Sequence, residues 1–267
     1  MRCEAYKLAS LTLHICGVLL RVVVLAGGKG SRAKPFSELS PKVMIPVNGR
    51  PVIDYVVRHI ASFPIIDEIL IVCSQDECLS GQVKSYFEGK ENLFNNKISF
   101  IDETVGGTGG AVLSARPRLE DQDEFLVWFG DNLVPLDITS LHRFSRAKRG
   151  IGCVVVSTSR RTETGFVEVA SDCQIIRFKE KPTITLSEPE CLGIYLFNKE
   201  ILKRIDKATR HEGNINLSFD VLENLTRNDR LYCYDIAPLD WIDAESPAKL
   251  ERNKDRAKAI IDEMRHR

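Results

Sequence analysis

The chain has 267 residues, 43% of them hydrophobic, so it is long enough to bury a full core and to form one large α/β domain. Its 37 basic and 37 acidic residues balance, which argues against nucleic acid or an anionic membrane as the main partner. The eight cysteines include no C-x-x-C pair and no metal-ligand spacing, so we expect a protein of the reducing cytoplasm. Disulfides remain an alternative for the cytoplasm of a thermophile.

Residues 1–20 contain an early arginine, a lysine and an apolar segment, in the loose manner of a signal peptide. The apolar segment runs directly into the next predicted strand, which leaves no cleavage site that would spare that strand. It is also too short and too interrupted to span a membrane. We interpret residues 1–20 as an N-terminal extension or a start-site artefact, with export as the alternative.

Residues 21–51 combine a strand with signals for phosphate binding. The apolar, β-branched run from Val22 to Ala26 predicts a buried parallel strand. A glycine-rich loop follows at once, where a backbone with few Cβ atoms can point its N–H groups at anionic oxygens. Arg32 and Lys42 add positive charge suited to a triphosphate. The segment therefore predicts a nucleotide-binding site.

Gly28, Gly30 and Ala33 also satisfy the dinucleotide-binding fingerprint G-x-G-x-x-G/A, which needs a helix at the glycines and an acid about 20 residues on. Pro35 interrupts that helix, and the nearest acid, Asp54, lies in a stretch whose apolar spacing predicts a helix. A Walker P-loop does not occur in the sequence. A glycine-rich turn without a ligand is the remaining alternative, and the adjacent positive charges argue against it.

The segment LAGGKGSRAKPFSELSPKVMIPVNGRP, residues 25–51, closely resembles the N-terminal signature of the sugar-1-phosphate nucleotidyltransferases, or NDP-sugar pyrophosphorylases. The family pattern runs roughly L-A-G-G-x-G-[ST]-R-L-x-P and then P-K-P-M-x-P-V. This chain departs from it at Ala33, where Leu is usual, and at Val43, where Pro is usual. The resemblance implies that the nucleotide is held by Leu25, Ala26, Gly27, Gly28, Gly30, Ser31, Arg32 and Lys42.

Beyond this signature, apolar runs typical of strands alternate with helical patterns. The strand candidates are 69–74, 125–129, 152–157 and 193–197, and the helix candidates are 51–62, 109–117, 137–149, 199–208, 217–226 and 247–266. The alternation predicts an α/β fold, a mostly parallel central sheet with helices on both faces, and the resemblance implies its Rossmann-like form.

We divide the chain into the extension, a nucleotidyltransferase domain at 21–246 and a C-terminal helix at 247–267. The domain has a nucleotide-binding half at about 21–150 and a sugar-binding half at about 151–246. The sequence holds no internal repeat, so we expect the short form of the family, without the hexapeptide-repeat acyltransferase domain of some relatives.

Two carboxylates stand where the family binds its metal ion. Asp131 directly follows the apolar strand 125–128, at the strand end where open α/β sheets bind ligands. A Gly-Asp pair alone is usually a turn, but Asp243 lies two residues after Trp241, as in the family's late W-x-D motif. The resemblance implies that Asp131 and Asp243 hold Mg²⁺, a hard ion that takes carboxylate and phosphate oxygens.

Sugar recognition is implied for the segment between these carboxylates. Gly165 to Glu168 (GFVE) and Phe178 to Pro182 (FKEKP) resemble the family motifs G-x-[VI]-E and [FV]-x-E-K-P. By that match, Gly165 and Glu168 would lie at the sugar and Lys181 at its phosphate, whereas a hairpin turn and a solvated loop are the alternatives. Relatives often carry an Asn where this chain has Cys191, a poor hydrogen-bond partner, so the sugar preference stays open.

The loop VGGTGGAV, residues 105–112, resembles the loop that leads into a helix beside the base in this family. The match implies nucleotide contacts from Gly107 and Thr108. Its G-T-G-G-A form looks more like guanylyl and some archaeal members than thymidylyltransferases. The base stays open, and a glucose- or mannose-type hexose 1-phosphate is the expected acceptor.

These parts predict an enzyme in which a sugar 1-phosphate oxygen attacks the α-phosphorus of an NTP and expels pyrophosphate. The nucleophile is already anionic, so positioning and charge neutralisation would carry catalysis. The candidate catalytic residues are Arg32, Lys42, Asp131 and Lys181. Two alternatives remain, a non-catalytic regulatory subunit that binds nucleotide sugars and nucleotidyl transfer to a non-sugar phosphate. The oligomeric state is open, with a homo-oligomer among the options.

Overall fold

The structure is a computed structural model that describes residues 19–28, 30, 33–208, 213–225 and 229–267. Of the N-terminal extension proposed at 1–20, only Leu19 and Leu20 lie in this part, and Leu20 already begins the first strand, β1 (Leu20–Leu25). Within the described ranges, no helix has both the length and the apolar character that a membrane span requires.

Seven strands form the central sheet, in the order β12–β8–β11–β6–β1–β4–β5. β1 pairs in parallel with β4 and β6, β4 with β5, and β8 with β12. β11 runs antiparallel to both of its neighbours, β6 and β8. The prediction of a mostly parallel sheet is confirmed. The bounds of the other six strands are β4 (Ile66–Cys73), β5 (Ile98–Asp102), β6 (Glu124–Phe129), β8 (Gly152–Arg161), β11 (Thr183–Asn198) and β12 (Leu231–Asp235).

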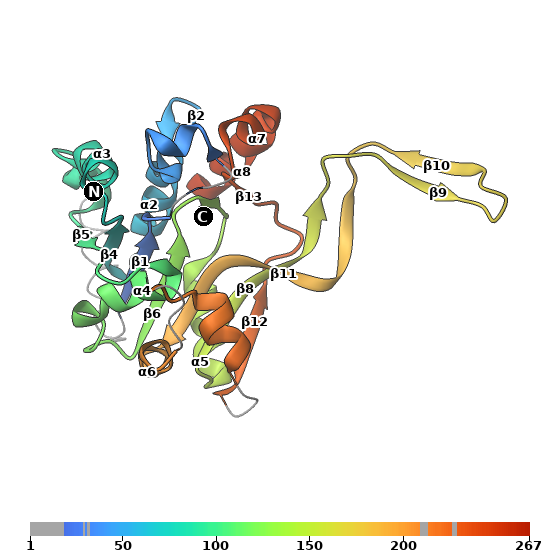
Figure 1. Ribbon diagram of the computed structural model, residues 1–267. Coiled ribbons are helices and arrows are strands. Elements are labelled where there is room, and N and C mark those ends of the chain that lie inside the picture. The colour runs from blue at the N-terminus through green and yellow to red at the C-terminus, as the bar shows by residue number, and fades with distance from the viewer. Residues whose placement is uncertain (1–18, 29, 31–32, 209–212, 226–228) are drawn as a thin grey trace, which may run out of the picture.

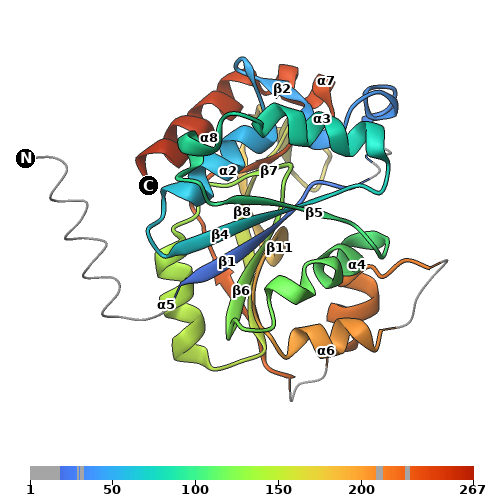
Figure 2. The ribbon, with the colours of Figure 1, turned by 90° about the vertical axis from the view of Figure 1, so that its left-hand side faces the viewer.

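Helices cover both faces of this sheet, as β1 illustrates. Val22, Val23 and Val24 are all fully buried, but Val23 belongs to a different hydrophobic cluster from the other two. Since side chains alternate along a strand, the two clusters lie on opposite faces. Figure 2 shows α2, α3 and α8 on one side of the sheet and α4 and α6 on the other. The helices are α2 (Val52–Ser62), α3 (Glu77–Phe87), α4 (Gly107–Ser114), α5 (Ile138–Lys148), α6 (Ile201–Asp206), α7 (Pro247–Arg252) and α8 (Lys254–His266).

Two predicted helices differ from the structure. The candidate at 217–226 forms a π-helical turn, Leu217–Val221, followed by a 3₁₀ turn, Leu222–Asn224. The tail predicted as one helix at 247–266 is broken at Asn253 into α7 and α8. The side-chain amide of Asn253 bonds to the Lys249 carbonyl and to Glu163, which gives this residue partners outside a regular helix.

Four short strands and four 3₁₀ turns complete the body of the molecule. The pairs are β2 (Pro46–Val47) with β3 (Arg50–Pro51), and β7 (Asn132–Leu133) with β13 (Ile242–Asp243). The 3₁₀ turns span Phe36–Glu38, Lys42–Met44, Glu91–Phe94 and Arg116–Arg118.

The remaining two strands, β9 (Phe166–Val169) and β10 (Ile175–Lys179), form an antiparallel sheet of their own. They continue from β8 and β11 and project away from the body of the molecule, as Figure 1 shows. We refer to residues 166–179 as the arm.

The six described cysteines are free thiols. Cys73 and Cys153 are buried in β4 and β8, where they pack as small apolar side chains, as their apolar sequence context predicted. Burial raises the pKa of the Cys73 thiol to about 12, so this thiol is inert near neutral pH.

Candidate active site

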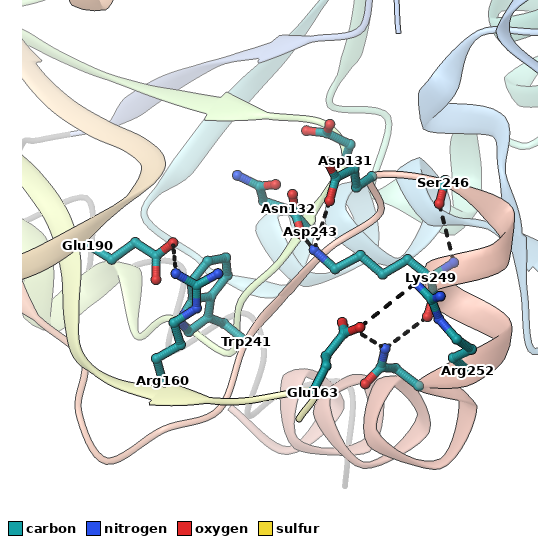
Figure 3. A network of polar contacts seen from close by, with 12 residues as sticks. Asp131, Asn132, Arg160, Glu163, Glu190, Trp241, Asp243, Ser246, Lys249 and Arg252 are labelled. Carbon is teal, nitrogen blue, oxygen red and sulfur yellow. Dashed lines mark hydrogen bonds and ion pairs between the residues drawn. The ribbon is translucent and has the colours of Figure 1, made fainter. Parts of the chain in front are cut away.

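The structure brings Asp131 and Asp243 together through the short β7–β13 pair. Asp243 lies opposite Asn132 in this antiparallel ladder, and the Ala244 N–H donates to the Asp131 carbonyl over 2.8 Å. Figure 3 shows both carboxylate side chains in one polar network. Two residues that are far apart in the sequence thus stand side by side at the carboxyl end of β6, where parallel sheets bind ligands.

Gly130 and Lys42 fix the position of Asp131. The Gly130 N–H donates to the carbonyl of Leu25 over 3.0 Å, and a Cβ on Gly130 would stand 2.9 Å from that oxygen. Only glycine therefore allows this close approach of β6 to the end of β1. Lys42 Nζ lies 2.5 Å from Asp131 Oδ2, and both side chains are about one-fifth exposed. A charged pair this short and partly desolvated is a strong contact.

The glycine-rich loop lies against the same lysine. Gly30 has a φ of +56°, and a Cβ built on it would be 3.2 Å from Lys42 Cβ. Gly27 lies against the backbone of Ser74, while Gly28 is exposed and a Cβ on it would meet no atom within 4 Å. Gly28 thus offers its backbone to open space. The predicted nucleotide contacts at Ser31 and Arg32 fall outside the described residues.

A second lysine, Lys249, holds the second carboxylate. Lys249 Nζ bonds to Asp243 and lies 3.3 Å from Glu245 Oε2. Burial disfavours its charge, but hydrogen bonds and attraction from the two carboxylates outweigh burial, so the pKa of Lys249 is raised. Lys249 lies on α7, where its N–H donates to the Ser246 side chain that caps the helix. Each carboxylate of the site is therefore paired with its own lysine.

The segment predicted to lie beside the base packs against another part of the chain. Gly107 has a φ of +86°, and a Cβ on it would stand 2.4 Å from the Ile215 carbonyl oxygen. Thr108 Oγ1 accepts a hydrogen bond from the Leu217 N–H over 2.9 Å. These contacts explain why glycine is needed at 107 without a ligand. Because α4 follows the carboxyl end of β5, the segment still lies at the ligand-binding edge of the sheet, and its contact with the base stays a prediction.

The predicted sugar-binding residues are distributed differently. Gly165 directly precedes the arm, Glu168 lies on β9 opposite Arg177, and Lys181 follows β10; all three are exposed. Cys191 lies on β11, where its Sγ is 3.3 Å from the Tyr195 hydroxyl. The structure brings Lys42, Asp131 and Asp243 together, but Glu168 and Lys181 do not line the pocket that contains Asp243.

That pocket has a volume of about 850 Å³ and lies between the base of the arm and residues 241–256. Its wall is strongly polar, with Arg160 3.4 Å from Glu190 and Arg252 3.8 Å from Glu163 (Figure 3). Lys249 and Asp243 also line it. The pocket therefore opens directly beside one of the two carboxylates and offers both cations and hydrogen-bond acceptors.

The family model described as Nucleotidyl transferase matches residues 21–254. The chain belongs to the nucleotidyl transferase family. The resemblance to sugar-1-phosphate nucleotidyltransferases inferred from the glycine-rich signature is thus confirmed, and the match includes Asp131, Asp243 and Lys249.

Named relatives are similar to this chain at 25–28% sequence identity, and the similarity covers only part of their length. The bifunctional protein GlmU of Methanocaldococcus jannaschii is 28% identical over 211 residues, which cover 78% of this chain and 47% of that protein. The mannose-1-phosphate guanylyltransferase catalytic subunit beta of Dictyostelium discoideum is 25% identical over 231 residues, 85% of this chain and 62% of that protein. The chain thus spans about half to three-fifths of the length of these relatives.

A crystal structure of UDP-glucose pyrophosphorylase complexed with UDP-glucose has the same fold. Its TM-score is 0.60 at 19% identity, covering 91% of this chain and 98% of that chain. This likeness shows that the two chains share their fold.

The chemistry of the two carboxylates suits a magnesium ion. Mg²⁺ usually takes one or two protein carboxylates and completes its shell with water and phosphate oxygens. Asp131 and Asp243 supply such a pair, and no group of three or more His, Cys, Asp or Glu suited to a metal occurs within the described ranges. The lysines on both carboxylates neutralise them in the protein alone.

Two residues of the candidate site, Lys249 and Asn132, had no predicted role in the sequence analysis. Asn132 Nδ2 donates to the Leu192 carbonyl over 2.6 Å, and Trp128 Nε1 donates to the Asn132 carbonyl over 3.0 Å. Asp131 lies in the turn after β6, and the bond from Asn132 to Leu192 anchors this turn to β11. Asn132 stands next to Asp131 in the sequence, which is a signal that it belongs to the same turn. Lys249 gives no such signal, since basic residues are frequent throughout the C-terminal tail.

Proposed function

We propose that the protein joins an NTP and a sugar 1-phosphate to give an NDP-sugar and pyrophosphate, with Mg²⁺ as cofactor. The observation that carries this proposal is the meeting of Asp131 and Asp243 with a lysine each, beside the glycine-rich loop at the carboxyl edge of the sheet. Family membership supports the reaction class. A catalytic subunit named for mannose 1-phosphate among the relatives is consistent with a hexose 1-phosphate as acceptor.

The reaction needs no general base, because the attacking phosphate oxygen is already an anion near neutral pH. The work of the protein is to align the two phosphates and to neutralise their charge. Mg²⁺ held by Asp131 and Asp243 would supply charge neutralisation on the phosphates. Lys42, now paired with Asp131, would turn toward the α-phosphate when that carboxylate binds the ion.

The glycine-rich loop would hold the departing pyrophosphate with its backbone N–H groups. Gly28 supports this role because it is exposed and its Cβ direction is open, and Gly30 of the same loop lies against Lys42. Arg32 keeps the role that the resemblance implies, contact with the same phosphates. Gly107 and Thr108 would lie near the base.

The sugar 1-phosphate would enter the pocket beside Asp243. Its volume of about 850 Å³ admits a hexose phosphate, and Lys249 with Arg160 offers cations for the phosphate. Carboxylates such as Glu190 can accept hydrogen bonds from sugar hydroxyls. Glu168, Lys181, Gly165 and Cys191 keep their implied sugar contacts as proposals, and the cytoplasm, where NTPs are supplied, is the proposed location.

The test is pyrophosphate release with Mg²⁺ across a grid of NTPs and sugar 1-phosphates. Asp131→Asn should lower turnover by about 10²–10³-fold, because a charged contact to the transition state is removed. Asp123→Asn is the matched control, since Asp123 is an exposed carboxylate just before the opposite end of β6. We expect the control to stay within about twofold of the wild type.

Other outcomes would assign the protein elsewhere. Folded protein that binds a nucleotide sugar but releases no pyrophosphate with any pair would be a regulatory subunit. Pyrophosphate release only with a non-sugar alcohol phosphate would show that the acceptor is not a sugar 1-phosphate. Equal turnover in Asp131→Asn and wild type would contradict the metal assignment.

A further inference from the structure

The arm has one apolar and one polar face, which follow from its strand register. Val167 pairs with Phe178, and Val169 pairs with Ile175, so these four side chains share one face. Glu168 pairs with Arg177 and Phe166 with Lys179 on the opposite face. We call the first set, Val167, Val169, Ile175 and Phe178, the apolar arm face.

No part of the described chain covers the apolar arm face. Its four side chains are 47–62% exposed, and the neighbouring Ile176 is 63% exposed. The two strands pair only with each other and project from the body (Figure 1). An isolated two-stranded hairpin is marginally stable in water, and apolar residues on one face of such a sheet are normally packed against another layer. The pattern is therefore that of a sheet with a missing partner.

We propose that the apolar arm face is an interaction surface for a second copy of this chain, with the two arms packed face to face across a two-fold axis. The face carries no charge, and it sets a phenylalanine beside β-branched side chains, so it is complementary to itself. Two sheets of this kind pack about 10 Å apart with interdigitated side chains. Because the arm extends from the body, two arms can meet without contact between the bodies.

The available area agrees with a dimer. The four side chains of the face and the adjoining Ile176, each 47–63% exposed, present on the order of 500 Å² per copy. Two copies would bury about 1,000 Å², which reaches the lower bound for a specific interface. The opposite face, with Glu168, Arg177 and Lys179 beside Phe166, stays outside the interface in this arrangement, as its charges require.

The test compares two adjacent substitutions on opposite faces of the full chain. Phe178→Glu places a charge on the apolar arm face, whereas Lys179→Glu changes the charge on the opposite face. Sedimentation velocity over a concentration series should give twice the 30.1 kDa chain mass for the wild type and for Lys179→Glu. Phe178→Glu should weaken the dimer by about 100-fold or more, since it removes an aromatic anchor and buries a charge.

A cross-linking measurement covers the case in which Phe178→Glu disturbs the hairpin itself. Phe178→p-benzoylphenylalanine should give a covalent dimer on irradiation, and the same replacement at Lys179 should not. A wild type that stays monomeric throughout the series would overturn the proposal. So would a Phe178→Glu dimer as tight as the wild type, or equal cross-linking from both positions. None of these outcomes depends on nucleotidyl transfer.

Discussion

In the charged pairs Lys42–Asp131 and Lys249–Asp243, a lysine ammonium group contacts each carboxylate of the site. In the protein alone, each carboxylate is neutralised by a lysine that belongs to a different element from its own. A divalent ion must therefore share or replace these contacts. This arrangement keeps two partly buried carboxylates from being left unpaired, which would be costly.

We therefore predict that Lys249→Met strengthens divalent-ion binding in the absence of nucleotide. The tethered cation competes with the ion for Asp243, and removing a unit charge a few ångströms away relieves repulsion of ~1 kcal/mol, or roughly fivefold in affinity. Isothermal titration with Mg²⁺ or Mn²⁺ measures this change. Lys254→Met is the matched control, because Lys254 is exposed on the neighbouring helix and pairs with Glu251. Unchanged ion affinity in Lys249→Met would show that the lysine does not compete at the site.

A second residue-scale prediction concerns the buried His59 on α2. Its Nδ1 lies 2.8 Å from the Met264 carbonyl oxygen and its Nε2 2.9 Å from that of Leu136. Burial lowers the pKa of His59, although the two carbonyls oppose this effect. The unfolded chain therefore takes up a proton at a higher pH than the folded protein does, so the free energy of unfolding falls as pH drops below about 6.5.

His59→Gln should flatten this pH dependence. Between about pH 7 and pH 5, the free energy of unfolding should fall more in the wild type than in the variant, because only the wild type carries the group whose folded-state pKa is lowered. Urea unfolding at a series of pH values gives both slopes under identical conditions. Parallel slopes for the two proteins would mean that His59 titrates alike in the folded and unfolded chain.

At the scale of elements, a buried carboxylate ties α2 to its neighbours. Asp54 is fully buried, and it accepts hydrogen bonds from Arg58 Nε over 2.7 Å and from the Tyr86 hydroxyl over 3.1 Å. Arg50 lies 3.2 Å from the same carboxylate. Asp54 lies on a helix, as the apolar spacing predicted, and its contacts give it a structural function on α2.

Asp54→Ala should lower the free energy of unfolding by about 2–3 kcal/mol, because two partly exposed arginines and a tyrosine lose their common partner. Tyr86→Phe should cost only ~1 kcal/mol, since it removes a single hydrogen bond. Chemical denaturation measures both changes, with the exposed Asp123→Ala as control. A loss below 1 kcal/mol in Asp54→Ala would show that solvent replaces the network.

The sequence predicts an element when a local pattern determines it, and does not predict it when contacts with distant residues determine it. The core strands are predictable because runs such as Val22–Leu25 are short, continuously apolar and rich in β-branched residues, which is typical of a strand buried on both faces. The position of the arm is not predictable from the sequence. The strand pattern at 166–169 would be the same whether the strand packed against the rest of the chain or projected from it. The break at Asn253 depends on contacts with Glu163, which no local pattern contains.

The candidate site shows the same division. Asp131 and Asp243 could be predicted because each lies in a family motif, and their meeting follows from the carboxyl edge of the sheet. The pairing of Lys249 with Asp243 requires the geometry of α7, and the close approach of Gly107 to Ile215 requires a tertiary contact. Both depend on residues distant in sequence, which a linear pattern does not relate.

At the scale of the whole molecule, the body and the arm are separate in their packing. The glycine-rich loop, Lys42 and both site carboxylates belong to the body, which is built on the seven-stranded sheet. The arm shares no sheet with it beyond the continuation of β8 and β11. The arm should therefore be removable without loss of the nucleotide-binding part.

We predict this outcome for a variant in which residues 167–178 are replaced by Asn-Gly. Phe166 and Lys179 form a strand pair, so a two-residue turn can close the hairpin between them. The melting temperature should stay within about 2 °C of the wild type, since no core residue is removed. NTP affinity should stay within about twofold, because all body contacts remain.

The same variant also separates the two proposed sugar contacts. It lacks Glu168 but keeps the pocket beside Asp243, so retained turnover with a sugar 1-phosphate would assign sugar recognition to that pocket. Turnover lost at unchanged NTP affinity would assign it to the arm. A fall in melting temperature of more than about 4 °C would contradict the prediction, since that is the effect of ~1–2 kcal/mol in a domain of this size and would mean that the arm stabilises the body.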